Sequence, residues 1–238
     1  MLGLGNTICS NHYPGGGWAP VDEGSSLVAW YEKKARVTAA VSNKVTLWEN
    51  QEGTTGYNMA QSTLTNQPTF NTTTGAVIFD GVDNFLKMTG QITLPTTFTI
   101  GIKFSTLTTG TVLLADSTIG NEMFKIIDSD TIRVKAFEDG ESPSNVTANL
   151  DLSEGDFDAD SYVVITRDGS GNMGFWHKGV DQSTSATLSV DYGVDIDTIG
   201  KRHGASPNYY KGDIFDVSIF NTTNNTITEQ LNIYLSGL

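Results

Sequence analysis

Cysteine, basic residues and long apolar runs are scarce in this sequence. Cys9 is the only cysteine, so no disulfide can form within one chain. Fourteen Lys and Arg residues stand against 27 Asp and Glu residues, which gives a net charge of −13. Nucleic-acid binding needs clustered basic side chains, so we expect no nucleic-acid partner. No run of 18 apolar residues could span a bilayer, and the acidic balance argues against a membrane partner.

A conventional export signal is also lacking. Residues 1–7 contain neither the basic stretch nor the continuous apolar core of a signal peptide. We therefore expect a chain that is made in a cytoplasm and is not exported by the usual route.

Against these absences, short strand signals are abundant, and the stretch 67–88 organises them. Val77, Ile78 and Phe79 form a β-branched and aromatic run, and the pair Asp80-Gly81 then predicts a turn. A second short strand follows at 85–88. The pattern predicts a hairpin-like corner with a buried Phe79 and with Gly81 at positive φ.

The rest of the chain has the period-two pattern of half-buried strands. Phe98, Ile100, Ile102 and Phe104 alternate with more polar residues or glycine. Further strands are expected at 111–115, 123–127, 131–137, 162–167, 173–177 and 212–220. The short turns 128–130 and 168–172 predict two antiparallel hairpins. The expected fold class is therefore all-β, with two antiparallel sheets packed as a sandwich.

A single helix is well signalled, at the C-terminus. Residues 226–229 match a capping box, in which Thr226 caps the helix and Glu229 reaches back. A helical apolar stripe follows, and Gly237 is expected to end the helix in left-handed geometry. The stripe consists of Ile227, Leu231, Tyr234 and Leu235.

The glycine-rich segment 15–17 divides the chain into an arm, residues 1–24, and a domain, residues 25–238. One interpretation is a frayed terminus. The other is an arm that docks on a neighbouring subunit or particle. Its apolar anchors would be Leu2, Leu4, Ile8 and Trp18.

Catalytic signals are few, and we expect no enzyme. Paired acids at alternate strand positions, as retaining glycosidases require, do not occur, because the spacing of Glu49 and Glu52 places them on opposite strand faces. His12, His177 and His203 have no nucleophile motif beside them. Cys9 has no nearby basic partner to activate it.

Residues 156–160 are the candidate metal site. Asp156, Asp158 and Asp160 offer three carboxylates at alternate positions, and hard oxygen ligands suit Ca²⁺. The alternative is a solvated acidic turn, since the glycine and the distant glutamate of an EF-hand loop are missing. No other cofactor is expected.

Aromatic side chains supply a candidate ligand-binding face, because sugar rings stack on exposed aromatic rings. Trp30, Trp48 and Phe175 are expected in the core. The candidates for the binding face are Trp176, Tyr192, Tyr209 and Tyr210.

Several motifs together resemble the laminin G-like / concanavalin A-like jelly-roll family. They are an apolar-Trp-Tyr strand at 27–31, the segment VTLWENQEG at 45–53, and FDGVD at 79–83. IGKR at 199–202 and YKGDIF at 210–215 are family-like too, whereas Asn84 departs from the second acid that is common there. The resemblance covers residues 25–238 and implies a jelly-roll sandwich followed by a short helix.

The opening MLGLGN, the Gly-rich segment and the acidic jelly roll also resemble virion structural proteins of tailed bacteriophages. This resemblance implies a non-catalytic capsid-decoration or tail-associated protein. It would be multicopy or homo-oligomeric, contact other capsid or tail proteins, and reside in the virion. The alternative is a carbohydrate-binding adhesion module of the tail-fibre type, with a cell-surface glycan as its partner.

Overall fold

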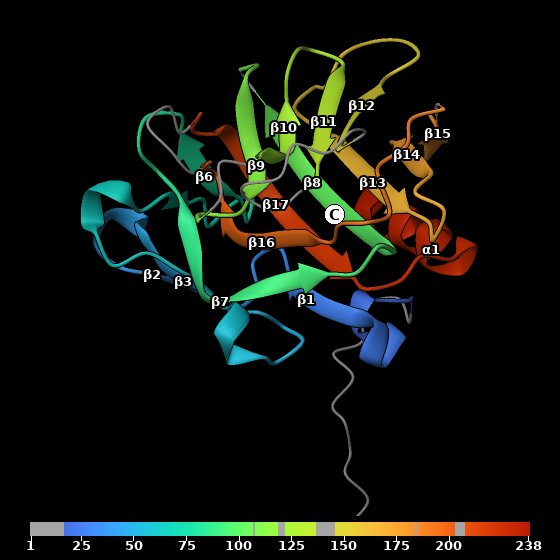
Figure 1. Cartoon of the computed structure of the whole chain (residues 1–238). Coiled ribbons are helices and arrows are strands. Elements are labelled where there is room, and N and C mark those ends of the chain that lie inside the picture. Colours follow the sequence, from blue (N-terminus) through green and yellow to red (C-terminus); the bar gives the residue numbers. More distant parts are fainter. Residues whose placement is uncertain (1–16, 107, 119–121, 137–145, 184, 203–207) are drawn as a thin grey trace, which may run out of the picture.

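Two antiparallel β-sheets pack face to face in the computed structural model, which describes residues 17–106, 108–118, 122–136, 146–183, 185–202 and 208–238 (Figure 1). Helix α1 (Asn225–Ser236) lies against the strands of one sheet. The predicted all-β sandwich with a short C-terminal helix is therefore confirmed.

The first sheet, called sheet A, carries the helix. In spatial order it contains β15 (Val180–Asp181), β14 (Met173–His177), β13 (Ser161–Arg167), β8 (Phe98–Thr106), β17 (Lys211–Phe220), β6 (Val77–Asp80) and β5 (Thr69–Phe70). An eighth strand, β1 (Leu27–Tyr31), also pairs with β17.

The second sheet, sheet B, forms the other layer. The 3-10 helix η1 (Pro20–Ser26) precedes β1, and three others connect early strands: η2 (Val41–Asn43), η3 (Thr55–Tyr57) and η4 (Leu64–Asn66). In spatial order the sheet contains β12 (Thr147–Asp151), β11 (Thr131–Lys135), β10 (Glu122–Ile126), β9 (Thr111–Ala115), β16 (Val194–Ile199), β7 (Leu86–Leu94), β4 (Met59–Ala60), β3 (Val45–Trp48) and β2 (Val37–Ala39).

The main core lies between the two sheets and follows the predicted alternation. On β8, Phe98, Ile100, Ile102 and Phe104 are all at most 1% exposed. Both predicted hairpins form, β10 with β11 and β13 with β14. Trp30, Trp48 and Phe175 are buried as expected.

The corner at Asp80-Gly81 differs from the expected hairpin, because it connects the two sheets. β6 pairs with β5 and β17 in sheet A, whereas β7 belongs to sheet B. Gly81 has the predicted positive φ of 77°, and the Asp80 carboxylate accepts a hydrogen bond from the backbone of Val82 at 2.8 Å. Phe79 is 1% exposed, so the predicted buried anchor is correct although the strand pairing is not.

Helix α1 covers part of sheet A and encloses a second apolar cluster. Leu231 sits on Gly101 of β8 so closely that a Cβ at residue 101 would lie 2.6 Å from its Cδ2 atom. The predicted stripe is buried, but the predicted caps are wrong. Asn224 caps the helix, with its Oδ1 atom accepting from Ile227 N at 2.8 Å, and Gly237 has right-handed φ of −82°. α1 has 12 residues, and across the described ranges no helix is both long and apolar enough to cross a membrane.

The start of the described chain corrects one of the predicted arm anchors. The ring of Trp18 stacks on Phe220 at 6.4 Å and meets Tyr234 edge-on at 6.3 Å. Its Nε1 atom donates to Glu23 at 2.9 Å. Trp18 therefore packs on its own domain rather than serving as a free anchor for another surface. Leu2, Leu4 and Ile8 lie outside the described residues.

Candidate functional site

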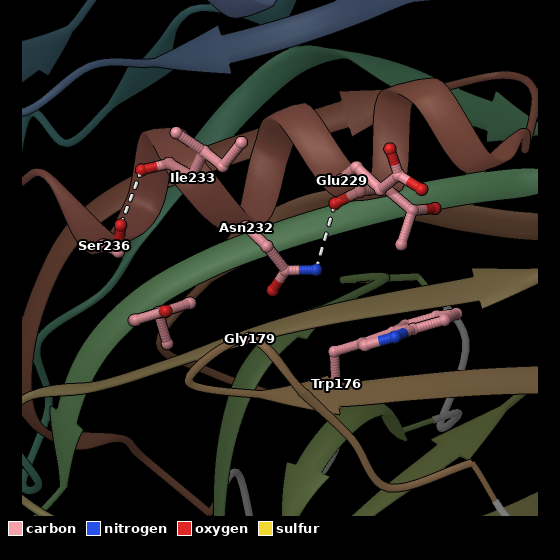
Figure 2. Close-up of a pocket in the computed structure, with 8 residues that line it drawn as sticks. Trp176, Gly179, Glu229, Asn232, Ile233 and Ser236 are labelled. Atoms are coloured by element: carbon pink, nitrogen blue, oxygen red, sulfur yellow. Dashed lines mark hydrogen bonds between the residues drawn. The ribbon is translucent and has the colours of Figure 1, made fainter.

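The most suggestive surface surrounds Trp176, on the side of sheet A that α1 covers. Two hollows lie there and share Trp176 and Thr228 in their walls. The first hollow has a volume of about 420 Å³ and is bounded by Tyr162, Trp176, Gly179, Thr228, Glu229, Asn232, Ile233 and Ser236 (Figure 2). The second has about 310 Å³ and is bounded by Thr166, Asp168, Asn172, Met173, Gly174, Trp176, Thr223, Asn224, Asn225 and Thr228. Together they form what we call the Trp176 face.

Strand register explains why Trp176 projects on this side. Side chains alternate along β14, so Phe175 enters the core while Gly174 and Trp176 share the opposite face. Trp176 pairs with Val164 of β13, which belongs to the apolar cluster beneath α1. The indole is thus anchored at one edge and partly open to solvent.

The absence of a side chain at Gly174 makes room for the indole of Trp176. A Cβ at residue 174 would lie 2.6 Å from the Cζ3 and Cη2 atoms of Trp176, which means that the six-membered ring lies over this glycine. Figure 2 shows the indole running along its strand, facing α1 across the first hollow. Local packing therefore fixes the position of the ring.

Helix α1 supplies the polar side of the first hollow. The Asn232 amide points from the helix toward the hollow, and its Nδ2 atom donates to Thr228 O at 3.0 Å (Figure 2). Its Oδ1 atom accepts no hydrogen bond within the described part of the chain. Glu229 and Ile233 are exposed on the same wall.

The 168–172 turn supplies the polar side of the second hollow. The Asp168 carboxylate accepts from the Asn172 amide at 2.8 Å and from Ser170 N at 2.8 Å. Burial alone would raise the pKa of Asp168, but the Asn172 side chain and the backbone N–H groups of the turn outweigh it. The pKa therefore lies below its ordinary value, and the carboxylate stays charged.

The three candidate calcium ligands are not gathered into one site. Asp158 forms a salt bridge with Lys178 at 2.7 Å, and Asp160 forms one with Lys103 at 3.0 Å. Within the described ranges, no group of three or more His, Cys, Asp or Glu side chains is arranged to hold a metal ion. The geometry thus favours the alternative, a solvated acidic turn that includes Asp156, and calcium binding itself stays an untested prediction.

A serine, a histidine and an aspartate do meet beside this turn. Ser161 Oγ lies 3.1 Å from His177 Nε2 and donates to Asp158 Oδ1 at 3.2 Å. The serine stands between the other two, and its side chain is fully buried. Burial also lowers the pKa of His177. This order and this burial do not suit nucleophilic catalysis, which needs an accessible serine and a histidine held by the acid.

Of the four predicted ligand-binding aromatics, Trp176 alone lines the two hollows. Tyr210 is fully buried and meets Phe79 edge-on at 5.8 Å, so its assignment to a binding face is wrong. Tyr209 lies beside Lys201, whose Nζ atom is 5.8 Å from its ring. Tyr192 belongs to the loop that buried Arg167 holds, through a 2.8 Å bond to the Tyr192 carbonyl. Trp176 is thus the one predicted aromatic at these hollows, its partners in the lining were not predicted, and ligand binding there stays a prediction.

Those partners come mainly from α1 and the segment before it. Thr228 and Asn232 reach Trp176 only through the packing of the helix on the sheet, which no local pattern reveals. The signal that could have pointed to them is the run NTTNNTIT at 221–228, unusually rich in hydrogen-bonding side chains.

No protein-family model matches the sequence, and no curated protein matches it significantly. Solved structures do share the fold. Trypanosoma rangeli sialidase in complex with sialic acid superposes with a TM-score of 0.55 at 12% identity, over 90% of this chain and 33% of that one.

Binding domains of botulinum neurotoxins are similar as well. The structure describing entry of botulinum neurotoxin type C through two ganglioside molecules gives a TM-score of 0.57 at 14% identity, over 92% of this chain and 53% of that one. The ligand binding domain of serotype D, in complex with N-acetylneuraminic acid, gives 0.55 at 16% identity over the same shares. The chain thus spans a third to a half of these proteins. At such identities the likeness establishes a shared jelly-roll-like β-sandwich fold.

Proposed function

We propose that the chain is a non-catalytic glycan-binding module that holds its ligand on the Trp176 face. The observation that carries this proposal is the indole of Trp176, fixed over Gly174 between two hollows that contain amide and hydroxyl side chains. A sugar presents an apolar face of C–H groups and a rim of hydroxyl groups. An aromatic platform beside amide and hydroxyl side chains matches both features.

The dimensions suit such a ligand. Volumes of about 420 and 310 Å³ fall at the lower end of the range of small-molecule sites, roughly 300–1,000 Å³. The fold provides further support, because two of the similar domains are described with ganglioside or N-acetylneuraminic acid. The sugar specificity of those proteins is theirs, and the proposal for this chain rests on its own residues.

The same residues support the proposal of binding without catalysis. Glycoside hydrolysis by the usual route needs two carboxyl groups on either side of the scissile bond. Two acids line the Trp176 face, Glu229 in the first hollow and Asp168 in the second. Asp168 accepts the hydrogen bonds of its own turn, so it does not suit the role of a second catalytic carboxyl group.

The test is a glycan array followed by titration calorimetry on the glycans that bind. Trp176→Ala should abolish measurable binding, and Trp176→Phe should retain part of it, because a smaller ring still stacks. Tyr209→Ala is the matched control, since it removes a half-buried aromatic ring away from both hollows. Melting curves establish that each variant is folded. Full binding by a folded Trp176→Ala variant would place the site elsewhere.

The virion role expected from the sequence is a separate proposal, supported by the phage-like resemblance and the acidic composition. In that setting the module would be a multicopy particle protein that displays the Trp176 face outward. Mass spectrometry of purified particles tests the location. Comparing particle binding by the full chain and by a chain lacking residues 1–16 tests docking by Leu2, Leu4 and Ile8, and leaves Trp18 in place.

A further inference from the structure

The charged side chains that line the Trp176 face are all acidic. None of the side chains that line the two hollows is a lysine, an arginine or a histidine. Glu229 is exposed at the first hollow, and Asp168 is held in its charged form at the second. A bound anion would therefore meet two carboxylates and no lining cation.

Two lysines beside the first hollow already form salt bridges with acidic side chains. Lys103 lies over the ring of Tyr162, at 5.8 Å, but is itself 5% exposed and pairs with Asp160. Lys178 precedes Gly179 at the rim of the first hollow and pairs with Asp158. Two acids of the turn 156–160 thus pair with these two lysines and reduce their attraction for an acidic ligand.

The two hollows are also connected through shared walls. Trp176 and Thr228 line both, so a ligand that covers the indole can extend into either space. The remaining lining is rich in neutral hydrogen-bonding groups, among them Asn172, Asn224, Asn225 and Asn232. Amide side chains both donate and accept, as hydroxyl and N-acetyl groups of uncharged sugars require.

We infer that the Trp176 face selects a linear oligosaccharide of neutral sugars, with rings in both hollows, and rejects sialylated or otherwise acidic glycans. The inference rests on the proposed glycan-binding function and specifies its ligand class. It gives this chain the opposite charge preference to the similar domain that is described with N-acetylneuraminic acid. Like charges brought together at a binding site weaken association, which makes the preference measurable.

The experiment uses the full chain and pairs of glycans that share one neutral core and differ only in a terminal sialic acid. Calorimetry at low and at physiological salt should give an affinity for the neutral member at least about tenfold higher, which corresponds to roughly 1.4 kcal/mol. The gap should narrow at higher salt, because screening weakens the repulsion. Affinity should also rise about tenfold or more from a monosaccharide to a trisaccharide, as the second hollow fills.

Glu229→Gln provides the residue-level test, because it keeps the shape of the wall and removes one charge. It should raise the affinity for the sialylated member more than the affinity for the neutral member, so that the ratio of the two affinities falls. Glu154→Gln is the matched control, since Glu154 is exposed and lines neither hollow.

The outcomes separate the two claims. Equal or tighter binding of sialylated glycans, lost in Trp176→Ala, would overturn the charge preference and leave the glycan-binding function standing. A monosaccharide bound as tightly as the trisaccharide would overturn the two-hollow ligand. Absence of Trp176-dependent binding to every glycan would overturn the proposed function and this inference with it.

Discussion

Asp216 should make the stability of the domain depend on pH, in a direction opposite to that of most acidic residues. It lies on β17 near α1 and is fully buried. Its Oδ2 atom accepts hydrogen bonds from Tyr234 Oη at 2.7 Å and from Trp30 Nε1 at 3.2 Å. Burial raises the pKa of Asp216 from 3.8 to about 7, with a smaller contribution of the same sign from Glu32, although the hydrogen bonds oppose the rise.

The direction of this pH dependence of stability follows from proton linkage. Between the unfolded and the folded pKa, the folded chain binds this proton and the unfolded chain does not. Stability from this group is therefore complete below the unfolded pKa, near 3.8, and is lost as the pH rises through the folded pKa, near 7. Between pH 5 and pH 8 the loss from Asp216 alone is about 2–3 kcal/mol.

Asp216→Asn removes the titration and keeps an oxygen that can accept from Tyr234 and Trp30. We expect the free energy of unfolding of the variant, relative to the wild type, to rise by about 2–3 kcal/mol from pH 5 to pH 8. Urea titrations followed by fluorescence at four pH values measure it. Asp151→Asn, at an exposed site on β12, is the control for a general charge effect. If the free energy of unfolding varied with pH in the same way in the wild type and in Asp216→Asn, this account of the buried carboxyl group would be refuted.

Three further substitutions test the packing. Gly174→Ala should weaken glycan binding roughly tenfold, about 1.4 kcal/mol, by displacing the Trp176 ring. Gly56→Ala, with open space at its Cβ, should leave the affinity unchanged. Equal affinities of Gly174→Ala and the wild type in calorimetry would contradict the proposed stacking on Trp176. Trp18→Ala should lower stability by about 1–3 kcal/mol, because its ring contacts with Phe220 and Tyr234 are lost. An unchanged melting temperature would contradict this packing and favour the predicted role of Trp18 as an arm anchor. Phe79→Ala should cost about 3–5 kcal/mol in denaturant titrations, and a much smaller loss would contradict its burial at the sheet crossing.

Strands that contain several large apolar or aromatic residues were predictable from the sequence because their signal is local. The bounds of β9 and β14 agree with the prediction residue for residue, and both hairpins were identified by their turns. β12 and β16 were missed. β12 alternates strictly but has only Ala148 and Leu150 as apolar residues, and β16 contains Asp195 and Asp197, so both local signals are weak and the place of each strand is decided by its neighbours.

The turn at Asp80-Gly81 and the N-cap of α1 are two features that local sequence patterns do not determine. Asp80-Gly81 specifies a turn but not whether the next strand returns to the same sheet, which depends on long-range pairing. At the helix start, Asn224 and Thr226 are both good capping residues, and a local rule cannot choose between them. The structure places the helix start two residues earlier than the capping-box pattern indicated.

The candidate site was predictable only in part, for a similar reason. Trp176 was proposed because it is aromatic. Tyr210 was proposed on the same ground, but the structure places it in the core. A tyrosine near a strand can be buried or exposed, and the choice depends on the opposite sheet. The contribution of α1 could not be predicted, because the helix packs on strands more than 50 residues away in the sequence.

The most direct test of the central claim observes the Trp176 indole itself. The chain has four tryptophans, so a ¹⁵N-labelled sample should give four resolvable indole N–H signals in a proton–nitrogen correlation spectrum. Trp176→Phe assigns one of them. On titration with a neutral oligosaccharide, the Trp176 signal should shift to saturation while the signal of fully buried Trp48 stays in place. A glycan that saturates the protein with the Trp176 signal unmoved, or a panel of neutral glycans that shifts no signal, would contradict the account.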